Sequence, residues 1–102
     1  MSKRTALILI GHLKPEAKQL PEEELAGFAV RVRRAAKQIG VTPVVGYTLS
    51  TQGSFLEIWE ADDKTTLEAF KQKLDALGHD KYYDRVLMTG ERAAEWIQTP
   101  TA

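Results

Sequence analysis

The sequence predicts an α+β domain in which a four-stranded antiparallel sheet carries two helices on one face. Three observations lead to this fold class: apolar segments of strand length, two segments whose apolar residues recur at helical spacing, and a tight polar turn between two strands. A chain of 102 residues is about the size of one compact domain. We expect a single domain over residues 1–102, with its core at 5–90 and a C-terminal helix and tail at 91–102.

The first strand is expected over Thr5–Leu13, a continuous apolar run that is too short for a good helix. The first helix is expected over Pro21–Ile39. Proline is tolerated in the first turn of a helix, and the three glutamates that follow it favour the positive end of the helix dipole. Apolar residues then recur at steps of three and four as far as Ile39, and Gly40 provides a stop.

The second and third strands are expected over Pro43–Ser50 and Ser54–Ala61. Only the short polar turn TQGS separates them, which predicts a hairpin. Asp62 or Asp63 can cap the helix that follows, because a carboxylate accepts hydrogen bonds from the first free backbone N–H groups. This second helix carries an apolar stripe and ends at Gly78.

The end of the chain provides the last strand. Residues 79–83 are expected to connect the second helix to a strand over Arg85–Thr89, and Glu91–Gln98 is expected to form a short helix. The predicted order is therefore strand, helix, strand, strand, helix, strand. This is the split βαβ or ferredoxin-like arrangement, which places both helices on one face of the sheet.

Composition excludes several classes of function. Fourteen basic residues balance fourteen acidic ones, which gives no electrostatic case for a nucleic-acid partner or for an anionic membrane. No apolar run approaches the roughly 20 residues of a membrane span, and the N-terminal sequence lacks the features of a secretory signal. We therefore expect a cytoplasmic protein. The absence of cysteine excludes disulfides, thiolate catalysis and cysteine-held metals.

Both faces of the expected sheet are apolar, although an antiparallel sheet with one wet face alternates cleanly between apolar and polar residues. Two helices cover one face. The other face is expected to expose a patch larger than monomers usually tolerate, formed by Ile8, Ile10, Phe55 and Trp59. A homodimer through this open face is the simplest cover. The alternative is that the C-terminal segment with Trp96 and Ile97 folds across it.

These features resemble the dimeric α/β-barrel superfamily, and the resemblance covers residues 5–90. It rests on the order of elements, on the "LPEEE" opening of the first helix and on "GYTLSTQGSFLEIWEADDKTTLEAF". The latter is similar to the hairpin, acidic cap and helix of the muconolactone-isomerase branch, and the superfamily also includes antibiotic-biosynthesis monooxygenases. The resemblance implies a homodimer whose non-helical sheet face lines a cavity beside the partner subunit. It carries over no catalytic residue, since fold does not fix function.

Glu57 is the sharpest candidate for chemistry, because strand alternation places it between Phe55 and Trp59 on one face. The expected register adds His12 to this face, and Tyr47 joins it if the hairpin register allows. A carboxylate surrounded by aromatic rings can act as a general acid or base near neutral pH. The alternative is structural: Glu57 forms a salt bridge across the dimer interface, with Arg85 as one candidate, or reaches water at the cavity mouth.

His12 is the second catalytic candidate, because histidine serves readily as a base near neutral pH. A lone histidine at a strand end is also often a surface residue. The segment "GHDKYYD" places His79, Tyr82 and Tyr83 after a helix stop, where they are expected to rim a ligand pocket. Alternatively, the two tyrosines anchor this segment onto the helices.

The expected function is binding of an apolar or aromatic small molecule, with cofactor-free monooxygenase or isomerase chemistry catalysed by Glu57 and His12. Tyr47, Phe55, Trp59, His79, Tyr82 and Tyr83 are the expected substrate-binding residues. No cofactor or metal is expected, because the two histidines lack the short spacings of a metal motif. The alternative function is a non-catalytic dimerisation module whose aromatic residues simply form the subunit interface.

Overall fold

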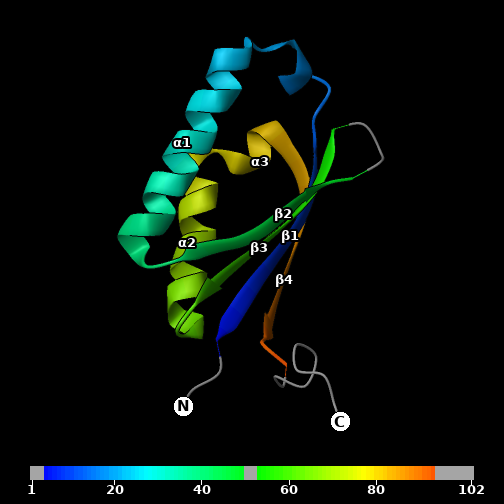
Figure 1. Ribbon diagram of the computed structural model, residues 1–102. Coiled ribbons are helices and arrows are strands. Elements are labelled where there is room, and N and C mark those ends of the chain that lie inside the picture. Colours follow the sequence, from blue (N-terminus) through cyan, green and yellow to red (C-terminus); the bar gives the residue numbers. More distant parts are fainter. Residues whose placement is uncertain (1–3, 50–52, 94–102) are drawn as a thin grey trace.

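The computed structural model describes residues 4–49 and 53–93, which form one antiparallel sheet with helices on one side of it (Figure 1). The strands are β1 (Thr5–Leu13), β2 (Thr42–Thr48), β3 (Ser54–Ala61) and β4 (Tyr83–Glu91). The helices are α1 (Glu22–Ile39), α2 (Lys64–Leu77) and the single turn α3 (His79–Tyr82), and a 3-10 turn, η1 (Ala17–Gln19), precedes α1. The predicted α+β class is confirmed. In the described part of the chain, no helix is both long and apolar enough to cross a membrane.

The strand order is β2-β3-β1-β4, and every neighbouring pair is antiparallel. β1 is therefore a central strand, with Leu9 opposite Glu57 on β3 and opposite Leu87 on β4. Directly opposite residues in a sheet point to the same face. This register decides which side chains meet on each side of the sheet.

Helix α1 begins one residue later than predicted. Pro21 has an extended backbone with ψ of 143° and lies just outside the helix, so the three glutamates form its first turn. Gly40 ends the helix in the left-handed region with φ of 102°, and its N–H donates to the carbonyl of Ala36. That conformation strains residues with a side chain, which explains why glycine stands there.

Asp63, rather than Asp62, caps α2. One carboxylate oxygen of Asp63 accepts hydrogen bonds from the backbone N–H of Thr66 at 2.7 Å and from its hydroxyl at 2.8 Å. Gly78 ends α2 as predicted, with φ of 87°. The following residues, which were expected to connect this helix to the last strand, form the turn α3, and this turn brings His79 under α1.

Strand β4 is longer than predicted, because it pairs with β1 along its whole length. The pairing runs from Leu13 opposite Tyr83 to Thr5 opposite Glu91. Glu91 therefore ends a strand and does not begin a helix, which corrects the prediction. Residues 92 and 93 follow it without helical structure, and the remainder of the predicted C-terminal helix, over residues 94–98, lies outside the described residues.

The core lies between the helices and one face of the sheet. Helix α2 packs on β1 and β3, and α1 packs against α2. Buried side chains of these elements, together with Val41 between α1 and β2, form one cluster: Leu7, Leu9, Phe28, Val32, Ala36, Val41, Trp59, Ala61, Leu67, Phe70 and Leu74.

The opposite, open face of the sheet is apolar, as predicted, but only part of its expected composition is correct. Ile8 and Ile10 of β1 point to it, with Leu56 and Ile58 of β3 opposite them. The side chains that it exposes most include Tyr47 (59%), Val86 (57%) and Met88 (46%).

The predicted placement of two aromatic residues on the open face was wrong. Phe55 lies opposite Gly11, and Trp59 lies opposite the fully buried Leu7, so both point toward the helices. Alternation along β3 correctly grouped Phe55, Glu57 and Trp59. The expected register against β1 was off by one residue, which exchanges the two faces.

Candidate functional site

A cavity of about 470 Å³ lies between α1 and the sheet and is partly open to solvent. Small-molecule sites usually enclose about 300–1,000 Å³ and combine apolar walls with a few polar groups. The cavity is lined by residues from five elements: Phe28, Ala29, Val32, Arg33, Pro43, Val44, Val45, Gly46, Phe55, Glu57, Trp59, His79 and Tyr83. Its size and its mixture of apolar and polar residues are those of a ligand site.

Glu57 enters the cavity from the middle of β3. Its Oε1 accepts a hydrogen bond from the indole Nε1–H of Trp59 at 3.1 Å. Trp59 is in turn fixed by the core, because its ring packs 5.1 Å from that of Phe70 and is only 5% exposed. Within the described residues, no cation forms an ion pair with Glu57. The carboxylate is therefore oriented by a neutral donor and keeps its second oxygen available.

The expected partner Arg85 does not pair with Glu57 within the chain. Its guanidinium binds the carboxylate of Asp75 on α2 and approaches Nδ1 of His79 at 2.9 Å. The Arg85 side chain is only 13% exposed, so α2, α3 and β4 together hold it in place. The guanidinium of Arg85 therefore interacts with the part of the cavity lining that contains His79.

His79 is a buried wall of the cavity, only 4% exposed, between the rings of Phe28 at 5.8 Å and Tyr83 at 4.8 Å. The pKa of His79 is lowered from 6.5 to about 4, mainly by burial and also by the nearby charge of Arg85, against smaller opposing effects of Asp75 and Asp80. Loss of hydration disfavours the charged ring. The imidazole of His79 is neutral at physiological pH.

Tyr83 completes the polar part of the lining. Its ring meets Phe55 edge-on at a centroid distance of 5.2 Å. Burial raises the pKa of Tyr83, and the negative charge of Glu57 raises it too. The phenol therefore keeps its proton and can donate a hydrogen bond to a ligand. The cavity thus combines one carboxylate, one neutral imidazole and one phenol.

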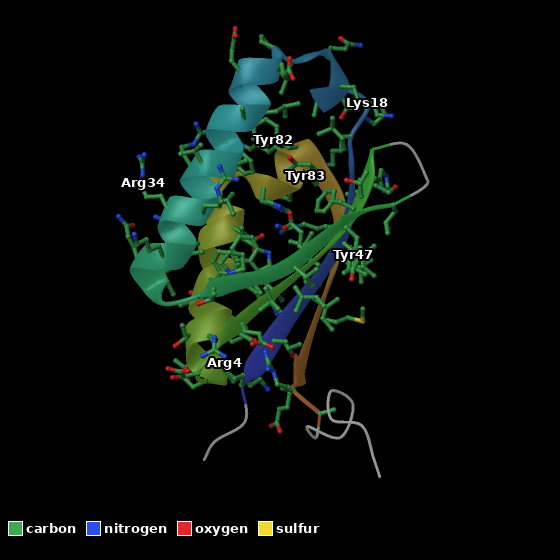
Figure 2. All side chains as sticks on the ribbon, in the orientation of Figure 1. Arg4, Lys18, Arg34, Tyr47, Tyr82 and Tyr83 are labelled. Atoms are coloured by element: carbon green, nitrogen blue, oxygen red, sulfur yellow. The ribbon has the colours of Figure 1, made fainter. Side chains whose placement is uncertain are left out.

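Five of the eight predicted site residues line this cavity: Phe55, Glu57, Trp59, His79 and Tyr83. The other three do not. Tyr47 points to the open face opposite Leu56, on the side of the sheet away from Tyr82 and Tyr83 (Figure 2). Tyr82 packs 4.5 Å from Phe28 and anchors its segment to α1, which was the alternative interpretation.

His12 lies outside the cavity. It points to the open face beside Ile10, and its Nε2 lies 3.2 Å from a carboxylate oxygen of Asp84. Because Glu57 points to the helical face, the sheet separates these two predicted catalytic residues. The same separation keeps His12 and His79 on opposite sides, so they cannot join in one metal site.

Sequence reasoning missed Phe28 and Arg33, which α1 contributes to the cavity. Phe28 belongs to the apolar stripe of α1, a pattern that indicates a core position only, and a charged residue such as Arg33 on a helix usually faces solvent. The signal was the position of Arg33 one residue after Val32 at the edge of this stripe. Residues at such an edge contact solvent and core together.

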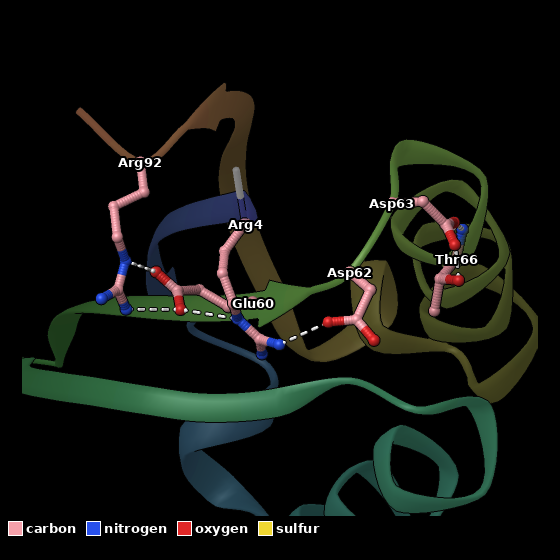
Figure 3. Close-up of polar contacts among 6 residues, drawn as sticks. All are labelled: Arg4, Glu60, Asp62, Asp63, Thr66 and Arg92. Carbon is pink, nitrogen blue, oxygen red and sulfur yellow. Dashed lines mark hydrogen bonds and ion pairs between the residues drawn. The ribbon is translucent and has the colours of Figure 1, made fainter. Parts of the chain in front are cut away.

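A second polar cluster, also missed, joins residues at the ends of three strands (Figure 3). Glu60 is 6% exposed and accepts from Arg92 at 2.6 and 3.1 Å and from Arg4 at 3.2 Å. Arg4 also binds Asp62 at 2.7 Å. The hydrogen bond from Arg92 leads the effects that lower the pKa of Glu60, against a smaller opposing effect of burial. We interpret this cluster as structural, since it joins the ends of β1, β3 and β4.

No protein-family model matches the chain, and neither does any curated protein. Solved structures do match. A conserved protein of unknown function from Bacteroides thetaiotaomicron, described as a possible oxidoreductase, has a TM-score of 0.61 at 13% identity and covers 90% of this chain and 100% of its own. A protein of unknown function from Nitrosomonas europaea has a TM-score of 0.58 at 17% identity, with 90% and 91% covered.

A de novo designed protein, Foldit4, also matches, with a TM-score of 0.54 at 18% identity over 90% of this chain and 100% of its own. A designed chain can therefore share this backbone arrangement. At such low identities the likenesses extend to the fold alone. The chain is similar to uncharacterised α+β proteins with a four-stranded antiparallel sheet.

Proposed function

We propose that this chain is a ferredoxin-like protein of the dimeric α/β-barrel type that binds an apolar or aromatic small molecule between α1 and the sheet. The strand order β2-β3-β1-β4 supports the fold assignment. The cavity carries the functional proposal, because it places an oriented carboxylate among aromatic rings. A purely structural interface module does not account for such a cavity.

Glu57 is the general base of the proposed site. A carboxylate held by one hydrogen bond, with its other oxygen available, can remove a proton from a bound substrate. Isomerisation and cofactor-free oxygenation of an aromatic substrate both begin with such a proton transfer. The proposed activity is therefore proton abstraction from an apolar substrate, which is the step that the isomerase and monooxygenase hypotheses share.

Binding of 2-naphthol tests the proposal. We expect wild-type protein to bind it, and Glu57→Gln to weaken binding by about 10-fold, because the hydroxyl loses a charged acceptor. Ala29→Phe, which fills the cavity from α1, should abolish binding. Ala26→Phe is the matched control on the exposed side of the same helix. Isothermal titration calorimetry measures all four proteins.

The control ligand is 2-methoxynaphthalene, which has no hydroxyl proton to donate. Its affinity should be the same for wild type and Glu57→Gln. Equal binding of 2-naphthol to wild type and Ala29→Phe would place the ligand elsewhere, and unchanged affinity in Glu57→Gln would remove Glu57 from the site.

We also propose that a second copy of the chain covers the open face. Val86 and Met88 of β4 and Tyr47 of β2 are exposed there around the half-buried Ile8 and Ile10. A two-fold axis through an apolar patch makes it complementary to itself. Sedimentation should show a dimer for wild type and a monomer for Val86→Glu. Val30→Glu, a matched change on the exposed side of α1, should remain dimeric. A monomeric wild type contradicts the proposal.

A further inference from the structure

The hydrogen bond between Arg85 and His79 fixes the position of the imidazole proton. Arg85 Nη1 lies 2.9 Å from Nδ1 of His79. A guanidinium has five N–H donors, no acceptor, and stays charged in proteins. Arg85 must therefore donate, and Nδ1 must accept with a free lone pair. The single ring proton of the neutral imidazole is then on Nε2.

The surroundings of His79 hold this arrangement. Asp75 on α2 binds the guanidinium of Arg85 and so fixes its direction. Asp80 lies one residue away on α3, and Glu57 and Arg33 line the same cavity from β3 and α1. A second proton on the ring would remove the lone pair that Arg85 needs and would place two cations together. This geometry agrees with the pKa of about 4 for His79.

The Nε2–H group of His79 is available to a ligand. No hydrogen bond joins Nε2 to any of the described residues. In the described part of the chain, every fully buried side-chain nitrogen or oxygen has a hydrogen-bond partner. Since Nε2 has none, it is not fully buried. His79 lines the cavity, and the ring edge that carries Nε2 is assigned to the proposed site.

We propose that His79 donates its Nε2–H to a carbonyl oxygen of the substrate, and that the substrates are apolar carbonyl compounds with a proton on the adjacent carbon. This inference rests on the proposed function of Glu57 as the base. An acceptor oxygen suits a cavity whose neutral donors are an imidazole N–H and the phenol of Tyr83. Arg85 is a positioning residue, because it acts through the tautomer of His79.

The step is an enolisation. A carboxylate oxygen of Glu57 takes the proton from the carbon next to the carbonyl, and the electron pair of that C–H bond becomes a C=C bond. The carbonyl π electrons move to oxygen, where the Nε2–H of His79 stabilises the negative charge. Return of a proton from the Glu57 carboxyl to the same or a conjugated carbon regenerates the carbonyl and the base. A neutral imidazole is suited to this role, as a general pattern of carbonyl chemistry shows.

Nitrogen NMR of the ring tests the tautomer without any ligand. In wild type at neutral pH, we expect Nδ1 of His79 to show the shift of an unprotonated nitrogen and Nε2 that of a protonated one. Arg85→Met keeps a long side chain but removes the donor, and should produce a mixture of tautomers. A protonated Nδ1 in wild type overturns the proposal.

Deuterium exchange into 2-tetralone, an apolar ketone with acidic protons beside its carbonyl, tests the chemistry. Wild type should accelerate exchange over buffer, and His79→Phe, which keeps an aromatic ring, should lower the rate about 100-fold, the effect of losing one oxyanion donor. His12→Phe on the opposite face is the matched control and should exchange like wild type. Circular dichroism verifies that both variants fold.

The two proposals fail differently. If 2-naphthol does not bind in the cavity, the proposed function and this inference fall together. If 2-naphthol binds as expected but wild type leaves 2-tetralone exchange at the buffer rate, only the inference is wrong. If folded His79→Phe exchanges 2-tetralone as fast as wild type, the proposed role of His79 is wrong, whereas the role of Glu57 as the base is unaffected.

Discussion

Replacing Phe28 by alanine should lower the free energy of unfolding by about 3–5 kcal/mol, the usual cost of deleting a buried phenyl ring. Phe28 is only 1% exposed, and its ring contacts those of Tyr82 at 4.5 Å and His79 at 5.8 Å. It thereby joins α1 to α3 and forms one wall of the cavity. A small domain is stable by only about 5–15 kcal/mol, so this loss is a large share of the total.

Urea denaturation measures the effect of Phe28→Ala. Phe28→Leu should cost less, because leucine fills most of the space, and Val30→Ala on the exposed side of the same helix should change stability by under about 0.5 kcal/mol. A loss of less than about 1 kcal/mol in Phe28→Ala would mean that α1 does not pack over the site as described.

Acidification from pH 7 to pH 4 should destabilise the protein by up to about 3 kcal/mol through His79 alone. The pKa of His79 is about 4 in the folded protein against 6.5 without the fold. Below pH 6.5 the unfolded chain binds a proton that the folded protein does not. The stabilising contribution is therefore complete above pH 6.5 and is lost as the pH falls toward 4.

The carboxylates act in a lower range. Hydrogen bonds lower the pKa of Glu60 below 4.5 and that of Asp63 below 3.8. Their stabilising contributions are present above those ordinary values and are lost as the pH falls through the folded values.

Urea denaturation at a series of pH values measures how the free energy of unfolding depends on pH. Between pH 6.5 and 4, the fall in this free energy that is due to His79 should disappear in His79→Phe and remain in His12→Phe. A slope unchanged in His79→Phe would show that His79 is not buried in its neutral form.

Local signals in the sequence predicted most of the elements, because each has its own physical cause. Helices α1 and α2 end at Gly40 and Gly78, where the backbone takes the left-handed conformation that glycine allows. Asp63, just before α2, accepts a hydrogen bond from a free backbone N–H of the first turn. The end of β4 was not predictable in this way. It depends on pairing with the far end of β1, and the residues at 89–91 show no apolar alternation.

Only part of the site was predictable, because local patterns group neighbouring residues but do not determine which face of the sheet they occupy. Alternation along β3 grouped Phe55, Glu57 and Trp59, but the face to which they point depends on a cross-strand register that one residue of shift reverses. His79 was selected from its polar and aromatic neighbourhood. Its bond to Arg85 depends on the turn α3, which folds residues six positions apart against each other. Such contacts come from tertiary geometry and leave little trace in the sequence.

The proposed ligand site lies under α1, on the helical face of the sheet. Methyl NMR during a titration with 2-naphthol tests it most directly, because the two faces carry separate reporters. We expect saturable shifts at Ala29 and Val32, which line the cavity, and none at Ile10 and Val86 on the open face. Shifts confined to Ile10 and Val86, or no saturable shift at any of the four, would contradict it.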